Sequence, residues 1–149
     1  MNSTFMRTPI GLLAIRAIDN AISHIAFVDR QDAPAIQHPL LVQAREQLQQ
    51  YFAGQRQAFS LPLAATGTEF QHQVWQALAR IPYAQTASYG QIAESIGKPK
   101  AVRAVGAANG RNPLAIVVPC HRIIGKDGKL TGYAGGLERK AWLLALEQG

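Results

Sequence analysis

The chain has 149 residues, 48% of them hydrophobic, and a formal net charge of +6. It is long enough to bury a core as one domain or two small lobes, and no stretch reaches the roughly 18 apolar residues of a membrane helix. The polar start at residues 1–4 is not a secretory signal. A single cysteine excludes an internal disulfide, a Cys-pair zinc site and a dithiol redox cycle, so we expect a reducing, cytoplasmic compartment.

The amino-terminal part of the chain predicts strands followed by one helix. Residues 6–18 and 21–28 have the composition of two strands joined by a tight turn. Pro39 then opens a helical pattern with its apolar residues on one face, and Gly54 ends it. No catalytic grouping is found in this region.

Residues 61–68 have the composition of a linker, which divides the chain into an amino-terminal α/β lobe, 1–64, and a carboxy-terminal domain, 65–149. The lobe carries five Arg and Lys against four Asp and Glu, whereas the domain carries ten against five. A basic domain favours a polyanionic partner, although a solvated basic face is equally common.

The carboxy-terminal domain begins with a run of predicted helices. Thr66 and Glu69 have the spacing of a capping box, and the helix that they open continues to Pro82. A second capping box begins at Ser88, and its short helix closes at Gly97. These helices lead directly into a third one.

The third helix runs from residue 98 to about 110, and with the preceding helix it forms a helix-turn-helix pattern. Between Arg103 and Ala108 it carries one long polar side chain among very small ones. A helix that reads the major groove needs several polar side chains, whereas Ala and Gly allow close backbone approach to the minor groove. Two interpretations stay open: minor-groove contact with Arg103 inserted, or small residues for tight helix packing.

The only cysteine, Cys120, follows the apolar, β-prone run 114–118 and a proline, and precedes His121 and Arg122. A thiol at the end of such a run, with cationic neighbours, is placed where its pKa can fall and a substrate can reach it. We therefore expect Cys120 to be a nucleophile on a strand.

Two further elements follow the cysteine. Residues 125–129 predict the turn of a hairpin wing, and Gly135-Gly136 precede a last helix. The predicted fold class is therefore α+β: a small lobe of antiparallel strands plus helix, joined to a winged helix-turn-helix-like domain that binds DNA and holds the active site.

From about residue 66 to the carboxy terminus, the chain resembles the O6-alkylguanine-DNA alkyltransferases. The Pro-Cys-His-Arg box at 119–122 and the Tyr-x-Gly-Gly-Leu sequence at 133–137 make the resemblance specific. Further matching segments are Phe70–Trp75, Ile81–Tyr83, Ser88–Gly90, Arg103–Gly106, Asn112-Pro113 and Lys140–Leu144. The resemblance implies a repair protein that binds duplex DNA from the minor groove and flips the damaged guanine out. It then moves the O6-alkyl group irreversibly onto the cysteine, once per molecule; activity on O4-alkylthymine is left open.

The chemistry of transfer also follows from the residue types. Displacement at a saturated carbon needs a soft nucleophile, and thiolate is the best side chain for it. Because neighbours on an extended segment point to opposite faces, we do not expect His121 to touch the Cys120 sulfur directly. The resemblance implies that His121 takes the thiol proton through a bridging water and is oriented by Glu147, which would otherwise be taken for a frayed terminal residue. It also implies that Asn112 ties the recognition helix to the active-site loop; a plain Asn-Pro turn explains that residue almost as well.

Expulsion of guanine needs its developing charge to be neutralised. The resemblance implies that Tyr89 donates a hydrogen bond to ring N3, and that the Tyr133 hydroxyl and the Ala134 backbone N–H address O6. Some family members carry serine where this chain has Ala134, but a backbone donor survives that change. Without the resemblance, both tyrosines would be interpreted as packing residues.

The expected partner is double-stranded DNA bearing O6-alkylguanine. Arg103 is expected to fill the gap left by the flipped base. The other expected DNA contacts are small residues of the same helix and basic residues around it: Ala104, Gly106, Ala107, Lys98, Lys100, Arg111, Lys126 and Lys129.

We expect a monomer, with cooperative binding to DNA left open, and neither a membrane partner nor a cofactor. We expect no metal, because the amino-terminal lobe lacks the cysteines with which some relatives hold zinc.

Two functions of other classes remain alternatives. A non-catalytic damage sensor or winged-helix regulator would use the cysteine only for packing. A thiol hydrolase or peptidase would use Cys120 with His121 and would need no DNA. The helix pair and the basic domain would then have no explanation.

Overall fold

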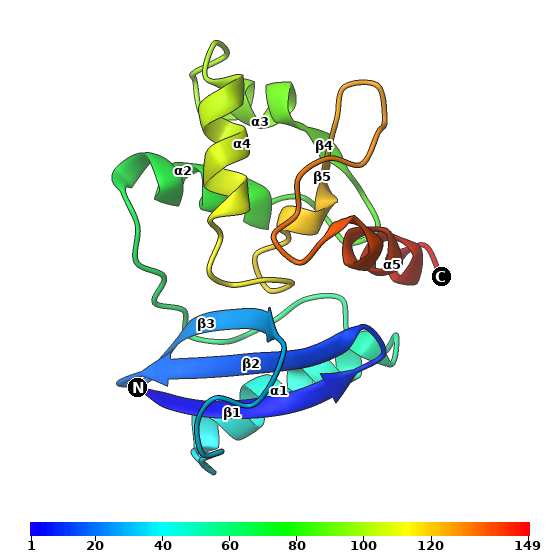
Figure 1. Cartoon of the computed structure of the whole chain (residues 1–149). Coiled ribbons are helices and arrows are strands. Elements are labelled where there is room, and N and C mark those ends of the chain that lie inside the picture. The colour runs from blue at the N-terminus through cyan, green and yellow to red at the C-terminus, as the bar shows by residue number, and fades with distance from the viewer. The chain divides into compact units, whose positions relative to one another are not determined.

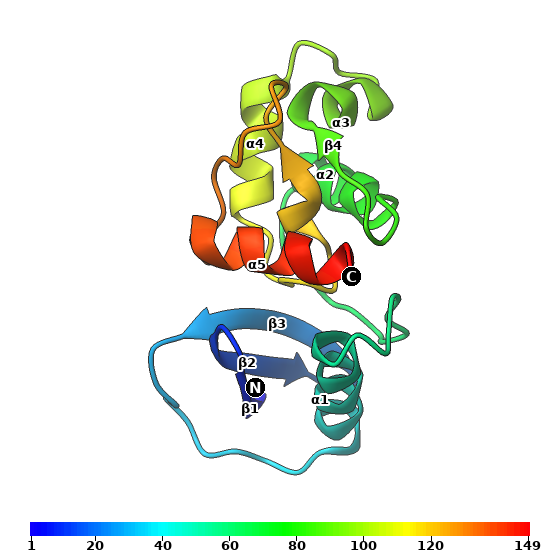
Figure 2. The ribbon, with the colours of Figure 1, turned by 90° about the vertical axis from the view of Figure 1, so that its right-hand side faces the viewer.

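A computed structural model describes all residues, 1–149, and the chain forms two compact units, Met1–Thr66 and Gly67–Gly149 (Figures 1 and 2). The predicted fold class is confirmed, because an antiparallel sheet with one helix is followed by a mainly helical unit. The structure contains no helix with the length and hydrophobicity of a membrane span. The elements of the first unit are β1 (Asn2–Thr8), β2 (Gly11–Ile18), β3 (Ala21–Val28) and α1 (Pro39–Phe52).

The sheet of the amino-terminal unit has the order β1-β2-β3. The prediction of a single strand over 6–18 is wrong, because a turn at residues 9–10 separates β1 from β2. The Thr8 hydroxyl donates to the Gly11 carbonyl at 2.7 Å and accepts from the Ile10 N–H, which closes this turn. Pro9 and Gly11 are turn-forming residues, so a local signal for this turn was present in the sequence and was missed. The turn predicted between β2 and β3 is present, with Asp19 at a positive φ of 54°.

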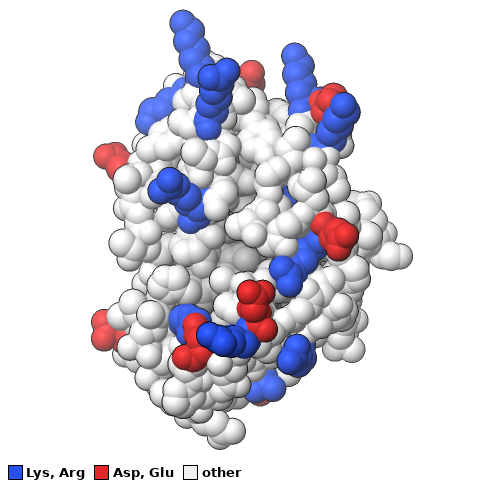
Figure 3. All heavy atoms as spheres, viewed as in Figure 1, with Lys and Arg blue, Asp and Glu red and all other residues white.

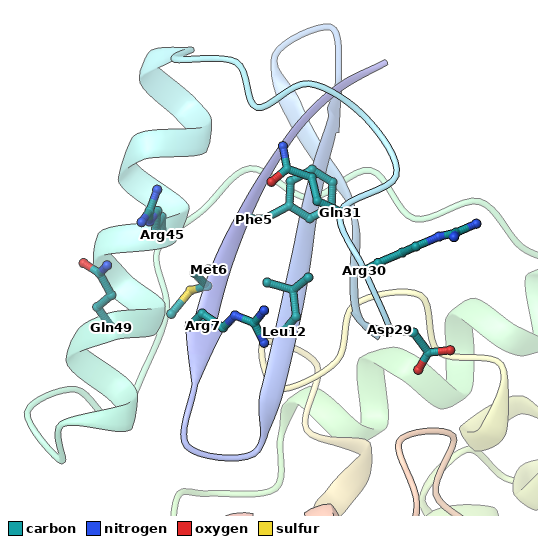
Figure 4. Close-up of a pocket in the computed structure, with 9 residues that line it drawn as sticks. All are labelled: Phe5, Met6, Arg7, Leu12, Asp29, Arg30, Gln31, Arg45 and Gln49. Carbon is teal, nitrogen blue, oxygen red and sulfur yellow. The ribbon is translucent and has the colours of Figure 1, made fainter.

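The core of this unit is apolar. α1 has the predicted bounds and packs against all three strands. Figure 4 shows Met6 pointing toward α1, while Phe5 and Leu12 point to the opposite face of the sheet. On that face Phe5, Leu12 and Ala14 form a small cluster. The predicted linker is partly ordered by the sheet, since Ile22 of β3 forms backbone hydrogen bonds with Pro62 and Ala64.

Three helices begin the carboxy-terminal unit, and they are α2 (Glu69–Ala79), α3 (Tyr89–Ser95) and α4 (Val102–Gly110). α3 packs against α4 as a helix-turn-helix requires. The capping box of the first helix is formed by Thr68 and Gln71, so the prediction of Thr66 and Glu69 is wrong by two residues. The second box, at Ser88, is confirmed. The third helix starts later than predicted, because a backbone bond from the Ala101 N–H to the Lys98 carbonyl forms a turn before it.

The cysteine does not lie on a strand, contrary to the prediction. Residues 114–118 form irregular turns, since the Asn112 side chain bonds the Leu114 N–H and the carbonyls of Leu114 and Val118, which a strand would need for its ladder. The cysteine opens a short 3₁₀ turn, η1 (Cys120–Arg122). The two-residue strand after it, β5 (Ile123–Ile124), pairs in parallel with β4 (Ala87–Ser88). This pairing brings the segment that follows the cysteine beside the start of α3.

The hairpin wing is absent, although its turn is present. The Gly125 N–H donates to the Lys129 carbonyl at 2.9 Å and closes the predicted turn. No strand returns from it, and the sheet that contains β5 holds only β4 and β5. The last helix follows Gly135-Gly136 as predicted and is α5 (Leu137–Glu147).

Candidate active site

Cys120 lies at the start of η1, where its side chain is 4% exposed. The sequence predicted that neighbouring cations lower the pKa of its thiol, and this prediction is wrong in direction. Burial raises the pKa of the Cys120 thiol above its ordinary value of 9.0, while a hydrogen bond with Asn112 and the charge of Lys140 oppose this rise. The adjacent guanidinium of Arg122 is not among these influences, because it is engaged elsewhere.

His121 is fully buried beside the cysteine and contacts the end of α5. Its Nε2 lies 2.6 Å from Oε2 of Glu147. Because Glu147 also pairs with Arg122, its carboxylate is ionised, and Nε2 must therefore carry the proton of this hydrogen bond. Nδ1 is then the acceptor of the ring, and it is buried without a partner in the protein.

Electrostatics keep this imidazole neutral. Burial lowers the pKa of His121 from 6.5, against the opposing influence of Glu147 and with the support of the charges of Arg122 and Lys140. A neutral ring with a free Nδ1 is a base that can accept one proton. The residue that follows the cysteine therefore supplies a buried proton acceptor.

Arg122 holds the carboxylate in place, a role that no sequence pattern assigned. Its Nε and Nη2 donate to the two oxygens of Glu147 at 2.8 and 3.1 Å, and its Nη1 donates to the Ile81 carbonyl at 2.7 Å. The Ala84 N–H donates to the same carboxylate at 3.3 Å. Glu147 is thus a buried, multiply bonded group and not a frayed terminal residue.

Asn112 connects α4 to the cysteine turn. It follows the end of α4, and its Nδ2 donates to the Val118 carbonyl at 2.8 Å. Its side chain also opposes the rise in the pKa of the Cys120 thiol. Asn112 therefore links the end of the helix to the irregular segment that precedes the cysteine.

Tyr89, the first residue of α3, points toward the segment that precedes α5. Its hydroxyl lies 2.9 Å from the Thr131 Oγ1. Its ring also lies beside Gly106 of α4, where an added Cβ would meet the ring at 3.6 Å. An added Cβ would make an ordinary van der Waals contact at this distance, so α3 and α4 pack closely here without requiring glycine.

Tyr133 and Ala134 lie on the segment between the 125–129 turn and α5. The Tyr133 hydroxyl is buried and has no partner in the protein. Burial raises its pKa, and the charge of Cys120 raises it further, so the phenol keeps its proton. Ala134 is exposed, and its backbone N–H donates no hydrogen bond within the protein. Both groups are free to donate.

Lys140 is a charged residue of this site to which the sequence analysis assigned no role. It is 0% exposed, and its Nζ donates to the Thr131 carbonyl at 2.5 Å. Burial lowers its pKa to about 8, while the charge of Cys120 opposes the change. Lys140 precedes Glu147 by seven residues, which is two turns of a helix, and this spacing could have placed it on the same face as Glu147.

The expected DNA contacts lie mainly on the surface of α4 and its surroundings. Arg103, Ala104 and Ala107 are exposed on α4. Figure 3 shows Lys and Arg side chains standing out from the end of the unit where α3 and α4 lie. Lys98 is engaged within the protein, since its Nζ donates to Gln73 at 2.9 Å and lies over the Phe70 ring. The other basic residues predicted to contact DNA are all exposed, and these are Lys100, Arg111, Lys126 and Lys129.

A hollow of about 470 Å³ lies in the amino-terminal unit and is lined by none of the predicted site residues (Figure 4). Arg45 lines it from α1 and Arg7 from β1, whereas the Arg30 side chain extends away from both. The structure brings together no cluster of three or more His, Cys, Asp and Glu that could hold a metal ion.

Both units match profiles of one protein family. Residues 69–149 match the 6-O-methylguanine DNA methyltransferase, DNA binding domain, and residues 1–65 match the ribonuclease-like domain of the same name. The chain belongs to this family. The resemblance inferred from the cysteine box is therefore confirmed, and it extends to the amino-terminal unit.

Several members of the family are close relatives over nearly the whole chain. A methylated-DNA–protein-cysteine methyltransferase of Mycolicibacterium paratuberculosis is 53% identical over 146 residues, which are 95% of this chain and 88% of the relative. The constitutive enzyme of that name from Bacillus subtilis is 50% identical over 156 residues, with 97% and 94% covered. The crystal structure of Mycobacterium tuberculosis OGT in complex with DNA has a TM-score of 0.91, 45% identity, and covers 99% of this chain and 93% of that chain.

Proposed function

We propose that this protein repairs double-stranded DNA by transferring the alkyl group of O6-alkylguanine to Cys120. The observation that carries the proposal is the buried thiol beside a neutral His121 whose ring is oriented by Glu147. Family membership of both units supports DNA as the substrate. We further propose that the protein acts as a cytoplasmic monomer without metal or cofactor.

The reaction begins with deprotonation of the thiol. Nδ1 of His121 accepts the proton through a bridging water, and the sulfur of Cys120 becomes a thiolate. The thiolate attacks the alkyl carbon, a sulfur–carbon bond forms, and the bond from that carbon to guanine O6 breaks. The electron pair of the broken bond moves onto guanine, which takes up a proton. The thioether product is stable, so each molecule reacts once.

Hydrogen-bond donors stabilise the departing guanine. Tyr89 donates to ring N3, and the Tyr133 hydroxyl and the Ala134 N–H donate to O6. The raised pKa of Tyr133 supports this role, because the phenol remains a donor when negative charge develops nearby. Asn112 positions the cysteine turn relative to α4.

DNA binds to the exposed face of α4 through the minor groove. Ala104, Gly106 and Ala107 allow close backbone approach, and Arg103 enters the base stack in place of the flipped guanine. The exposed Lys100, Arg111, Lys126 and Lys129 contact phosphates, whereas Lys98 must first exchange its contact with Gln73.

The test is incubation with a duplex that contains O6-methylguanine, followed by intact-mass measurement. We expect the protein to gain one methyl group on Cys120, with no gain in Cys120→Ser, which should still bind the duplex. A damage sensor would bind and keep its mass. A thiol hydrolase would turn over activated esters repeatedly and gain no methyl group from DNA, and either result would overturn the proposal.

A further inference from the structure

β1 is an outer strand of the amino-terminal sheet, and part of its outer edge is uncovered. The sheet has the order β1-β2-β3, so β1 pairs only with β2. The backbone groups of successive strand residues point to alternate sides, and those of Ser3 point outward, because its carbonyl accepts from the Ile36 N–H at 2.9 Å. By the same alternation the N–H and C=O groups of Phe5 and Arg7 point outward, and no group of the chain hydrogen-bonds them there.

The hollow of the amino-terminal unit lies along this stretch of β1. Residues 5–7 of the strand line it, and Leu12 of β2 adds to its apolar part (Figure 4). Arg45 and Gln49 border it from α1, and residues 29–31 border it from the segment that follows β3. Its volume of about 470 Å³ is within the range of ligand sites in proteins. The hollow therefore offers space beside backbone groups that have no partner.

The charged side chains of this hollow leave an excess of positive charge. Three arginines line it, and these are Arg7, Arg30 and Arg45. Asp29 is the only carboxylate among its lining residues. None of the four takes part in an ion pair of the chain, whereas Arg16 of the same sheet does. Exposed guanidinium groups attract carboxylates and phosphates, so the charge favours an anionic ligand.

The uncovered edge distinguishes between the anions that this charge would attract. Phosphate groups only accept hydrogen bonds, so a nucleic-acid backbone would leave the outward carbonyls of Phe5 and Arg7 without partners. An extended peptide presents both N–H and C=O groups along its edge and satisfies both kinds. A second copy of β1 does not supply the anion, because its sequence, Asn2–Thr8, contains an arginine and no carboxylate.

We propose that the edge of β1 is a docking site for an extended, acidic segment of a partner protein, which joins the sheet as a fourth strand. The backbone of the segment bonds the outward groups of Phe5 and Arg7. Arg7 lies on the Phe5 face of the sheet and Arg45 on the α1 face, and neighbouring side chains of a strand point to opposite faces. Two adjacent carboxylates of the segment therefore reach both arginines. The inference does not depend on alkyl transfer, because every residue assigned to that reaction belongs to the other unit.

The test is NMR titration of the full-length protein with capped peptides of about six residues, the usual length of a strand. The probe has two adjacent glutamates between valines and threonines, and the control peptide has lysine in place of both glutamates. We expect the probe to shift the backbone amide signals of Phe5 and Arg7 and to slow their hydrogen exchange. The lysine peptide should bind about tenfold more weakly or less, because it meets like charge.

Two protein variants test the charge contribution separately. Arg7→Gln and Arg45→Gln each keep a hydrogen-bond donor and lose the charge, and the Arg30 side chain extends away from both (Figure 4). Each variant should weaken binding of the probe by about threefold to fivefold, as expected for an exposed ion pair. Arg80→Gln removes an exposed cation of the other unit and should leave the affinity unchanged.

A third peptide tests strand addition without any change to the protein. It is the glutamate probe with N-methyl groups on the amides that would face β1, and it should bind about tenfold more weakly or less, because those donors are lost. Undiminished binding of this peptide would overturn strand addition. Failure of the glutamate probe to bind at millimolar concentration, or equal binding of the lysine peptide, would overturn the proposal as a whole.

Two further results would assign the hollow to another occupant and overturn the proposal. A single-stranded oligonucleotide that shifts the amides of Phe5 and Arg7 and displaces the probe would indicate a nucleic-acid site. A dimer in sedimentation that the probe dissociates would indicate that this edge pairs with a second copy of the chain.

Discussion

The two units of the molecule bury different kinds of polar group. The amino-terminal unit buries only neutral ones, and these are Ser3, Thr4, Ser23 and Gln47. The carboxy-terminal unit buries one neutral residue, Asn109, and all the ionisable polar ones, which are His121, Arg122, Lys140 and Glu147. Buried charge lowers stability unless it is paired. Its concentration around a single cysteine indicates that the second unit is organised for reaction chemistry, whereas the first is organised for packing.

Removal of Glu147, which pairs with two of the buried ionisable residues, should cause the largest loss of stability. In Glu147→Ala the buried Arg122 and His121 lose their shared partner, and we expect the free energy of unfolding to fall by about 3–5 kcal/mol. Chemical denaturation measures the loss. Glu138→Ala, on the exposed side of the same helix, should change stability by no more than about 1 kcal/mol, a dipole effect. Similar losses in both variants would contradict a buried charge cluster.

A packing defect in the amino-terminal unit should cause the second-largest loss of stability. Leu13 is 0% exposed, so Leu13→Ala should cost about 2–5 kcal/mol through lost burial and the cavity that remains. Circular dichroism during denaturation measures this cost. Leu63→Ala, at a residue that is 42% exposed, is the matched control and should change stability by less than about 0.5 kcal/mol. A small effect at Leu13 would mean that this sheet is not close-packed.

The surface of the carboxy-terminal unit should affect rate more than stability. Arg103→Ala removes an exposed side chain, so folding should be nearly unchanged. Because base extrusion costs a few kcal/mol, we expect methyl transfer from duplex DNA to slow by about 10- to 100-fold. Transfer from the free methylated base should change little. Equal slowing on both substrates would exclude a flipping role for Arg103.

Acid should destabilise the buried cluster through His121. Its pKa is lowered in the folded protein, so between that value and 6.5 the unfolded chain binds more protons. The stabilisation is therefore present above pH 6.5 and is lost as pH falls toward the folded pKa, with a slope of at most about 1.4 kcal/mol per pH unit. Urea denaturation across this range measures the slope. His121→Gln should reduce it, and an unchanged slope would assign the acid sensitivity to another group.

Local signals in the chain predicted much of the fold. The capping box at Ser88, the helix start at Pro39 and the glycine pair before the last helix act within a few residues, and each was placed correctly. The errors arose where a distant or competing hydrogen bond decided the structure. Asn112 binds the backbone of the segment before the cysteine and prevents a strand there. β5 pairs with β4, a strand that lies more than 30 residues earlier in the chain and that no local pattern identified as its partner.

The sequence by itself determined the helix pair and the family, and it predicted the nucleophile, because the residues of the Pro-Cys-His-Arg box are neighbours in the chain, as are the small residues of α4. Only the tertiary structure decided how easily the thiol of Cys120 ionises. Burial raises the pKa of Cys120, and the charge of Lys140 opposes this rise, while Glu147 orients the neighbouring His121. Both residues lie on a helix that is about 20 residues or more away from the cysteine in the chain. Desolvation and Coulomb interactions depend on distance in space, and no local pattern records that distance.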